Sequence, residues 1–341
     1  MTIRRVLWLS PWMRPLARVY AEALRRQQVE VLLVTSEQHP ESNAARDYEL
    51  VLDPRPKAPA TWLEFSRALR PIRRFDADVV VTELVRDPRW VTLGRGRPRV
   101  ELIHDDRPHD VDETRPRWER ALFDSWGARS AATVTFSKYV ATAIGGASVV
   151  PLTSDLSPEL APAVAPAERR RDFVLVGRLN PYKNIDVTLR AWAAHVNGAH
   201  WEGDQLVLIG DGTAPKALGP HVRWVRGAYS YRDVLSTMAQ AKASVVHYRR
   251  ATQSGVQVLA MQLGVTPIVS SVGALPEFQP EGECAIGVDD VPGLTAMFDA
   301  LADPAAAARR GERARKHFLQ RYDADRSAQA LLEVLERASV R

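Results

Sequence analysis

Cysteine and long apolar runs are nearly absent from this chain of 341 residues. The single cysteine, Cys284, cannot form an internal disulfide, which agrees with a reducing compartment, and we interpret it as inert packing. No apolar run approaches the ~20 residues that span a bilayer, and the opening residues, MTIRRVLWLS, lack the pattern of a signal peptide. These absences predict a cytoplasmic protein.

Signatures of nucleic-acid and dinucleotide binding are also missing. No cysteine or histidine spacing fits a zinc finger, and no aromatic-basic pattern fits an RNA-binding module. No Gly-x-Gly-x-x-Gly follows a first strand, so the chain lacks the signature of a dinucleotide dehydrogenase. We therefore expect no nucleic-acid partner.

Positive charge is not concentrated in one tail. The net charge is +5 and the pI is about 9.5, but the lysines and arginines are spread along the chain. Nucleotide phosphates and an anionic membrane face are both compatible with this excess. Four arginines of one predicted helix fit either a peripheral membrane face or a solvated helix surface, namely Arg67, Arg70, Arg73 and Arg74.

The length and the hydrophobic pattern predict an α/β protein of two domains. A chain of 341 residues exceeds a typical single core. Over residues 1–156, short apolar strands alternate with helical patterns, which is typical of a Rossmann-like domain. Strands are expected at residues 4–10, 29–35, 48–52, 78–84, 100–104 and 132–137, and helices at 16–27, 60–75 and 116–128.

A second alternating series follows a change in composition. Residues 157–172 are rich in Pro and Ala and are predicted to be a linker. Residues 173–320 then predict a second Rossmann-like domain, and the final segment, up to residue 341, is strongly helical in propensity and is expected to form a long terminal helix. Strands are expected at residues 173–177, 205–212, 222–227, 243–248 and 266–271.

The stretch FVLVGRLNPYKNID, residues 173–186, turns an apolar strand into a basic loop and then a helix. Arg178 and Lys183 lie on the loop. A helix start already attracts anions, so two cations there make sense if a phosphate sits between them. A solvated loop with two exposed cations is the alternative.

This stretch is similar to the donor-binding signature of GT-B glycosyltransferases, specifically of the large retaining family called GT4. The resemblance of VGRLNPYKNID implies that Arg178 and Lys183 hold the diphosphate of a nucleotide sugar. LVLIGDGT resembles the family's Gly-x-Gly turn, and VRWVRGAYSYRD resembles the segment around the nucleobase. The implied donor-binding positions are Gly177, Asn184, Gly210, Gly212, Gly227, Ala228, Tyr229, Thr252, Gln253, Ser254 and Gly255.

The resemblance also implies the architecture and a residue of the first domain. It implies two Rossmann-like domains facing each other across a cleft, with a C-terminal helix, residues 321–341, returning toward the first domain. VELIHDDRPHD resembles the family's strand-end His-Asp, so His104 is expected beside the transferred sugar and Asp105 on the acceptor side.

Two acidic clusters invite a metal-binding interpretation. One cluster follows the strand expected at residues 100–104 and comprises His104, Asp105, Asp106, His109 and Asp110. The family implied by the resemblance needs no metal. Asp76 and Asp78 precede a strand instead of following one, so we interpret them as strand-entry residues.

Two departures from the family pattern stand out. The family brackets its donor with two glutamates, and the equivalent positions here hold Thr252 and Ala260. A carboxylate accepts several hydroxyl hydrogen bonds, which alanine cannot replace; Thr252 and its polar neighbours supply neutral groups or simply cap a helix. The family's glycine-rich first loop is SPWMRP here, where Trp12 and Arg14 are expected to line the acceptor side, with ordinary packing of Trp12 as the alternative.

The implied chemistry is glycosyl transfer with retention from a UDP, GDP or dTDP sugar, without a cofactor. Arg178 and Lys183 would neutralise the leaving diphosphate, and His104 would orient the sugar. The acceptor stays open among a saccharide, a lipid-linked intermediate, a small molecule and a protein side chain. A catalytically silent relative that serves as a partner or scaffold is the alternative.

Overall fold

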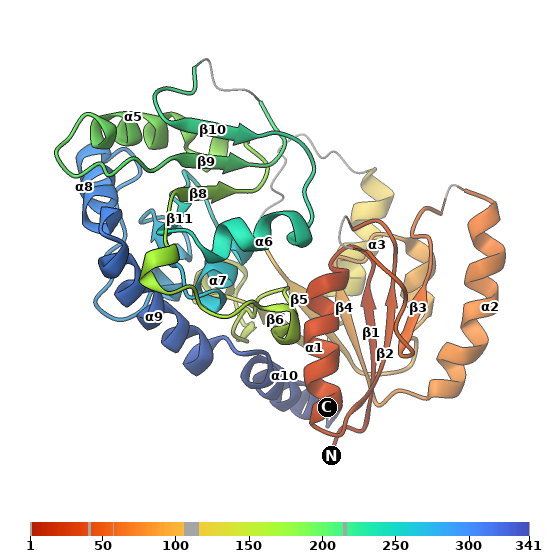
Figure 1. Ribbon diagram of the computed structural model, residues 1–341. Coiled ribbons are helices and arrows are strands. Elements are labelled where there is room, and N and C mark those ends of the chain that lie inside the picture. The colour runs from red at the N-terminus through yellow and green to blue at the C-terminus, as the bar shows by residue number, and fades with distance from the viewer. Residues whose placement is uncertain (1, 40–41, 57, 106–115, 214–216, 341) are drawn as a thin grey trace. The chain divides into compact units, whose positions relative to one another are not determined.

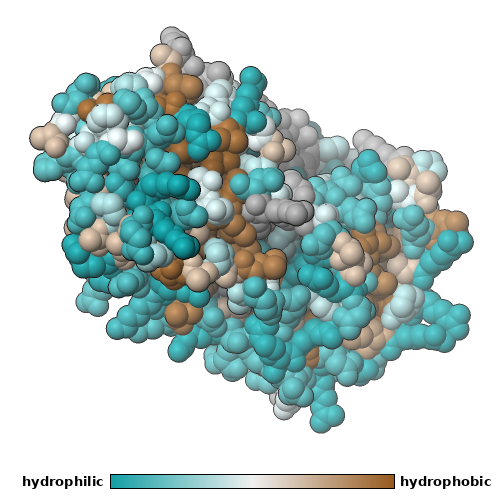
Figure 2. All heavy atoms as spheres, in the orientation of Figure 1, coloured by the Kyte–Doolittle hydropathy of each residue, from teal (hydrophilic) through white to brown (hydrophobic). Residues whose placement is uncertain are grey.

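The computed structural model describes residues 2–39, 42–56, 58–105, 116–213 and 217–340. The chain divides into two compact units, and each is described by itself. Unit 1 comprises residues 1–155 and 324–341, and unit 2 comprises residues 156–323. Among the described residues, none of the helices combines the length and apolar character needed to cross a membrane. Most of the surface on the face shown in Figure 2 is hydrophilic.

Unit 1 is built on a parallel sheet in the order β3-β2-β1-β4-β5-β6-β7 (Figure 1). The expected strands and helices of this half are all present, and Pro71 lies inside α2, which continues to Phe75. The strands are β1 (Arg5–Ser10), β2 (Glu30–Thr35), β3 (Glu49–Val51), β4 (Val79–Glu83), β5 (Arg99–Ile103), β6 (Ala132–Thr135) and β7 (Ser148–Val149). The helices are α1 (Arg14–Arg26), α2 (Ala60–Phe75), α3 (Arg117–Gly127), α4 (Lys138–Ile144) and α10 (Ala324–Ser339).

Entry into β4 is organised by the aspartates that precede it. The Asp78 carboxylate accepts hydrogen bonds from the backbone N–H groups of Arg4 and Arg5, at 2.8 and 2.9 Å. Asp76 forms ion pairs with Arg5 and Arg97. The interpretation of these aspartates as strand-entry residues is confirmed.

Unit 2 is built on a five-stranded parallel sheet in the order β10-β9-β8-β11-β12. Its five expected strands are all present. The strands are β8 (Phe173–Val176), β9 (Leu206–Ile209), β10 (Val222–Val225), β11 (Ala243–Val246) and β12 (Thr266–Val269). The helices are α5 (Ile185–Val196), α6 (Tyr231–Ala239), α7 (Gly255–Gln262), α8 (Val291–Ala302) and α9 (Pro304–Arg321).

The all-apolar sequence of β8 follows from burial on both faces of this sheet. Phe173 and Leu175 belong to a core layer with α5 and α8, whereas Val174 and Val176 belong to a second layer with α6 and α7. A strand with helices on both faces has no solvent side, so polar alternation would leave unpaired groups in the core. The α/β interpretation of this half of the chain is therefore confirmed.

The segment predicted as a linker, residues 157–172, lies within unit 2. It contains two short 3₁₀ turns, Pro158–Leu160 and Ala167–Arg169. The buried guanidinium of Arg170 donates to the backbone carbonyls of Ala165, Ala241 and Gly264, at 3.2, 3.0 and 2.7 Å. These bonds explain why the segment packs on unit 2 despite its prolines.

The helical C-terminal segment is two helices and not one. The break lies at Tyr322, which stacks on Phe278 with ring centroids 5.2 Å apart. Helix α9 belongs to unit 2, whereas α10 returns to unit 1 and packs against α1 (Figure 1). The predicted return of the chain end is confirmed. Cys284 is exposed, so its interpretation as packing is wrong.

Candidate functional site

The candidate site of unit 2 lies at the carboxyl ends of β8 and β11. These strands are adjacent, while β9 lies on the other side of β8, so the strand order reverses between β8 and β11. In open α/β sheets, ligands bind at such a switch point, outside the carboxyl ends of the strands. The loop after β8 carries Gly177, Arg178, Lys183 and Asn184.

Lys183 is buried at this switch point, with only 4% of its surface exposed. Its ammonium donates to the Tyr248 hydroxyl at 2.6 Å and to the Val176 carbonyl at 3.4 Å, and it lies 3.9 Å from the centroid of the Tyr248 ring. Burial lowers the pKa of Lys183 to about 8, against a smaller opposing effect of Tyr182. A fixed charge with few protein partners suits an anionic ligand.

Gly177 makes room for this lysine. Its φ is +119°, and a Cβ placed on it would lie 3.0 Å from the Lys183 Nζ. Any other residue would therefore strain the backbone and press on the ammonium. The glycine, predicted as a donor-binding position, thus leaves the space that the Lys183 ammonium occupies.

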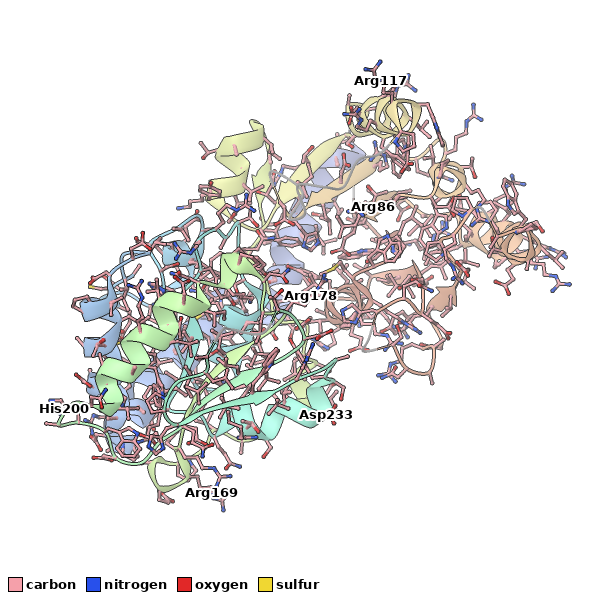
Figure 3. All side chains as sticks on the ribbon, turned by 90° about the horizontal axis from the view of Figure 1, so that it is seen from above. Arg86, Arg117, Arg169, Arg178, His200 and Asp233 are labelled. Atoms are coloured by element: carbon pink, nitrogen blue, oxygen red, sulfur yellow. The ribbon has the colours of Figure 1, made fainter. Side chains whose placement is uncertain are left out.

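Arg178 has a different environment from Lys183. The side chain is exposed, and among the described residues no ion pair or hydrogen bond involves it. Figure 3 shows its position in the loop after β8. Of the two cations predicted to act together, one is therefore buried and hydrogen-bonded, and the other is exposed.

Gly210 and Gly212 pack the loop after β9 against the loop after β8. A Cβ on Gly210 would lie 2.3 Å from the Gly177 carbonyl oxygen, and a Cβ on Gly212 would lie 2.8 Å from the Leu179 backbone nitrogen. Both residues have positive φ, +134° and +148°. The two glycines hold the loops together at the carboxyl edge of the sheet.

Asn184 caps α5 in a left-handed conformation and is fully buried. Its amide lies 3.2 Å from the His247 Nδ1 and donates to the Val288 carbonyl at 2.7 Å. His247 in turn lies 3.0 Å from the Gly287 carbonyl through its Nε2, and burial lowers its pKa. A neutral imidazole with its proton on Nε2 satisfies both contacts.

The other predicted donor positions lie on loops and at one helix start. Ala228 and Gly255 are exposed, Gly227 and Tyr229 are half-buried, and Gly227 and Gly255 face open space at their Cα atoms. The start of α7 carries three more: Thr252 and Ser254 are buried and Gln253 is half-buried, and the Ser254 hydroxyl accepts from the Gln257 backbone N–H at the N-cap of α7.

Ala260, which stands at the position of the family's second glutamate, is a residue of α7 and is fully buried in the core layer that α7 shares with β8 and α6.

Unit 1 carries a second polar cluster at its own switch point, between β1 and β4. The His104 Nε2 lies 2.6 Å from one oxygen of Glu83, whose carboxylate is fully buried. The other oxygen of Glu83 accepts from the Ser10 hydroxyl at 2.6 Å and from the Trp8 indole at 3.3 Å. The cluster fixes the His104 ring, which also packs on Phe136 at 4.9 Å between ring centroids.

The predicted acceptor-side residues differ in their surroundings. Trp12 and Asp105 are half-buried. Arg14 is only 1% exposed and forms an ion pair with Glu49 at 2.8 Å, in a cluster where Arg18 also pairs with Glu49. The guanidinium of Arg14 thus lies inside its own unit and contacts the first residue of β3.

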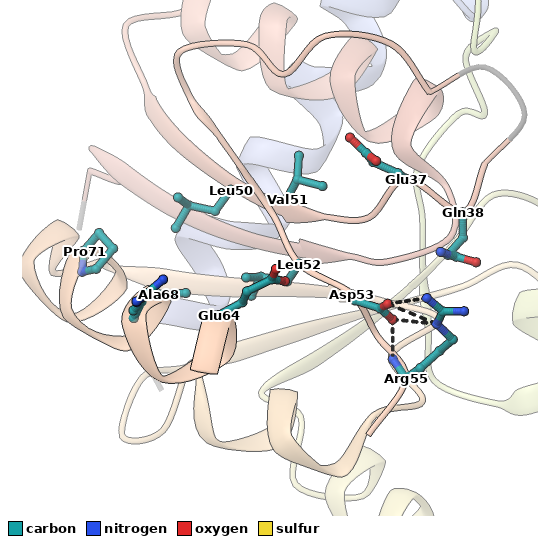
Figure 4. A pocket seen from close by; sticks show the side chains of 11 residues that line it. Glu37, Gln38, Leu50, Val51, Leu52, Asp53, Arg55, Glu64, Ala68 and Pro71 are labelled. Carbon is teal, nitrogen blue, oxygen red and sulfur yellow. Dashed lines mark hydrogen bonds and ion pairs between the residues drawn. The ribbon is translucent and has the colours of Figure 1, made fainter. Parts of the chain in front are cut away.

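A groove of about 700 Å³ lies at the carboxyl ends of β2 and β3, next to α2 (Figure 4). Leu50, Val51 and Ala68 contribute apolar surface to it. Asp53 is paired with Arg55, which lowers the pKa of that carboxyl. The volume of this groove suits a ligand of the size of one or two sugar rings.

Among the described residues, no three histidine, cysteine, aspartate or glutamate side chains are grouped closely enough to hold a metal ion. Of the acidic cluster discussed above, Asp106, His109 and Asp110 lie outside the described residues.

Two residues with clear positions in these clusters were missed by the motifs. Glu83 ends β4, where the sequence showed only a strand, and Tyr248 lies two residues after the end of β11. Their one signal is placement, because each is a polar residue at the carboxyl end of a buried strand.

Part of the chain matches a known protein family. Residues 170–303 match the family model described as Glycosyl transferases group 1. A comparison with curated proteins gives no match.

Solved structures resemble the chain along its whole length. Sucrose-phosphate synthase from Thermosynechococcus elongatus is 17% identical with a TM-score of 0.72, covering 98% of each chain. The catalytic domain of starch synthase IV from Arabidopsis thaliana, bound to ADP and acarbose, is 12% identical with a TM-score of 0.71 over 100% of each chain. An E. coli structure titled trehalose-6-phosphate, bound with UDP-2-fluoro glucose, is 10% identical with a TM-score of 0.66, covering 97% of this chain and 99% of that one. The chain therefore has the GT-B fold.

Proposed function

We infer from the group 1 match over residues 170–303 and from the GT-B fold that this protein is a glycosyltransferase that uses a nucleotide-sugar donor. The observation that carries the proposal is the buried Lys183 ammonium at the switch point of unit 2. Burying a charge is costly unless it is paired, and this one has a hydroxyl and a carbonyl but no carboxylate within the described residues. A diphosphate supplies the missing negative charge.

Lys183 and Arg178 would both stabilise the negative charge of the leaving group, each in a different way. A fixed ammonium stabilises charge as it develops without reorganising, which is the main requirement when a nucleoside diphosphate departs. The exposed Arg178 can close on the phosphates after they bind. Relatives of the same fold were solved with UDP-2-fluoro glucose and with ADP, which supports a nucleoside diphosphate as the leaving group here.

His104 would orient the transferred sugar, with Glu83 holding its ring. The carboxylate of Glu83 faces Nε2 and keeps the proton there. We propose transfer with retention of configuration, as the resemblance of the loop after β8 to the retaining family implies. NMR analysis of the anomeric configuration of the product tests this point directly.

The donor would be a UDP, GDP or dTDP sugar. Thr252 and Ala260 offer no carboxylate to the sugar or ribose hydroxyls, so these contacts would come from neutral groups at the start of α7. A deoxyribose nucleotide loses least by this change. The ranking of the three nucleotides by affinity therefore reports on the missing carboxylates.

A thermal-shift panel of UDP, GDP and dTDP tests the proposal, because a ligand that binds only the folded protein raises its melting temperature. We expect at least one nucleotide to do so, with and without EDTA, since the resemblance implies a metal-independent site. Calorimetry should then show weaker binding for Arg178→Ala and Lys183→Ala, and unchanged binding for Lys316→Ala, an exposed lysine of the same unit. If no nucleotide stabilises the protein, the catalytically silent relative is the better description.

The acceptor class stays open among a saccharide, a lipid-linked intermediate, a small molecule and a protein side chain. The groove in Figure 4 is the region of unit 1 where we would look for acceptor contacts. Glu64 lines it, and among the described residues the Glu64 carboxylate has no ion pair, so it can accept hydrogen bonds from hydroxyl groups.

We also propose that α2 contacts an anionic membrane face. Its outward side carries Trp62 and Leu63, which are 53% and 57% exposed, together with four exposed arginines that have no ion pair among the described residues, Arg67, Arg70, Arg73 and Arg74. Apolar groups beside uncompensated arginines favour a lipid surface over nucleic acid.

Co-sedimentation with vesicles tests the membrane contact. We expect binding to vesicles with anionic lipid but not to neutral ones, and loss of binding in the triple variant Arg70→Glu, Arg73→Glu, Arg74→Glu. The double variant Arg190→Glu, Arg223→Glu, on exposed positions of unit 2, should bind as the wild type does. Salt-sensitive binding to a random DNA duplex without vesicle binding would contradict the membrane assignment.

A further inference from the structure

The Lys183 ammonium has more donors than protein acceptors. An ammonium carries three N–H groups, and within the described residues two acceptors receive them, the Tyr248 hydroxyl and the Val176 carbonyl. Gly177 contributes no side chain on the side where its Cβ would lie 3.0 Å from Nζ. One N–H is therefore available to a ligand.

The segment that carries Lys183 is paired with the segment after β11 in antiparallel order. The backbone N–H of Arg249 donates to the Tyr182 carbonyl at 2.7 Å. Lys183 contacts Tyr248 and Asn184 contacts His247, so each step forward along one segment is a step back along the other. Three successive contacts of this kind fix the lysine relative to β11.

Tyr248 itself is fixed from several sides. It is 2% exposed, and its backbone N–H donates to the Ser270 hydroxyl at 3.0 Å. Its ring packs edge-on against Tyr182, with centroids 5.8 Å apart, and its hydroxyl forms a side-chain hydrogen bond with Ser254. The acceptor that Lys183 uses is thus held in place by β12 and by the start of α7.

The chemistry of the partner matters as much as its position. A carboxylate beside Lys183 would neutralise the ammonium and weaken its attraction for a phosphate. A neutral hydroxyl stabilises the protonated lysine by a hydrogen bond and leaves its charge uncompensated. The groups that face Lys183 from the elements packed around it are Tyr182 on its own loop and Tyr248 after β11, and both are uncharged at neutral pH.

We propose that Tyr248 is the positioning residue of the donor site, whose hydroxyl orients the Lys183 ammonium so that its remaining N–H points at a phosphate oxygen of a nucleoside diphosphate. The inference rests on the function proposed above. It assigns to the end of β11 a role in recognising the diphosphate that no motif of the sequence indicates.

The variant Tyr248→Phe removes the hydroxyl and keeps the ring. The pKa of Lys183 should fall further, because the hydrogen bond that favours its charged form is lost. We expect the affinity for the nucleotide that best stabilises the wild type to fall about tenfold at pH 7.5, and the alkaline loss of affinity to begin about one pH unit lower, since bonds to charged groups are worth about one pKa unit or more. Calorimetry from pH 6.5 to 9.5 measures both. The control variant Tyr20→Phe removes a buried tyrosine hydroxyl of unit 1, not of the unit that carries Lys183, and should leave both values unchanged.

Several results would overturn the inference. An unchanged affinity and pH midpoint in Tyr248→Phe, or tighter binding, would show that the hydroxyl does not orient the lysine. If the variant does not fold, NMR of ¹⁵N-lysine in the wild type decides: slow solvent exchange of the Lys183 Nζ–H groups supports the bond to the Tyr248 hydroxyl, whereas exchange as fast as that of an exposed lysine overturns it. Absence of nucleotide binding by the wild type would overturn the proposed function itself, whereas binding with an unaffected Tyr248→Phe would overturn this inference alone.

Discussion

The two units place opposite charges at the same point of the same kind of sheet. In unit 1 the switch point between β1 and β4 holds the buried Glu83 carboxylate, while in unit 2 the one between β8 and β11 holds the buried Lys183 ammonium. Each is held by neighbours at the carboxyl ends of adjacent strands. The fold thus decides where a functional group lies, and the residue placed there decides which chemistry it serves.

The two buried charges also differ in how well they are satisfied. Glu83 receives three hydrogen bonds, from Ser10, Trp8 and His104, whereas Lys183 has two acceptors and an uncompensated charge. A fully bonded group organises protein atoms around it. A partly bonded one is prepared for a ligand, so we assign a positioning role to Glu83 and a binding role to Lys183.

Replacing Lys183 by Met should have the largest effect, because it removes the buried charge of unit 2 and keeps much of the side-chain volume. We expect nucleotide affinity to fall more than 100-fold while the stability of the protein at pH 7 rises by about 2 kcal/mol, since a buried, incompletely paired charge is lost. Calorimetry and urea unfolding measure the two effects. Lys316→Met, at an exposed position, should change neither.

The pH dependence of that stability difference has a definite sign. The pKa of Lys183 is about 8 in the folded protein and 10.5 without the fold, so between these values the unfolded chain binds the extra proton. Wild-type stability therefore gains from rising pH in this window, and the advantage of Lys183→Met should vanish by about pH 10.5. Nucleotide affinity of the wild type should fall over the same range. A stability difference independent of pH would contradict the burial of a charged lysine.

The variant Glu83→Gln tests the positioning role of the buried carboxylate in unit 1. The amide keeps the shape but presents an NH₂ group to one of three donors, so the His104 ring loses its orientation. We expect donor turnover to fall about 100-fold and nucleotide affinity to stay within a factor of two, as measured by release of labelled sugar and by calorimetry. Equal losses of turnover and nucleotide affinity would show that Glu83 does not act through the sugar-side histidine.

Gly177→Ala should have the smallest effect of the three. The added methyl would lie 3.0 Å from the Lys183 Nζ at a φ of +119°, so it strains the backbone and displaces the ammonium. We expect a loss of stability of about 1–2 kcal/mol and an affinity about tenfold lower. Gly203→Ala has a similar φ, +93°, with nothing within 4 Å of its Cβ, so it should lose stability but keep the affinity. Identical nucleotide affinities in the two variants would show that Gly177 does not set the position of the Lys183 ammonium.

The strands were the easiest part to predict, because a parallel strand covered on both faces is a short apolar run such as Phe173–Val176. Lys183 and Gly177 were found because the loop after β8 is a contiguous motif. Glu83 and Tyr248 were not, since their partners lie 73 and 65 residues away in the sequence, at Ser10 and Lys183. The break at Tyr322 was missed for a similar reason, because helix propensity is local and the stacking on Phe278 is not.

The way α10 completes unit 1 bears on the order of folding during synthesis. Unit 2 is continuous from residue 156 to 323, so it can fold as soon as it leaves the ribosome. Unit 1 begins first, but α1 receives its cover only after α10 (Ala324–Ser339) has been made. Truncation near the C-terminus should therefore leave an intact second half joined to an aggregation-prone first half, with the apolar side of α1 exposed to chaperones.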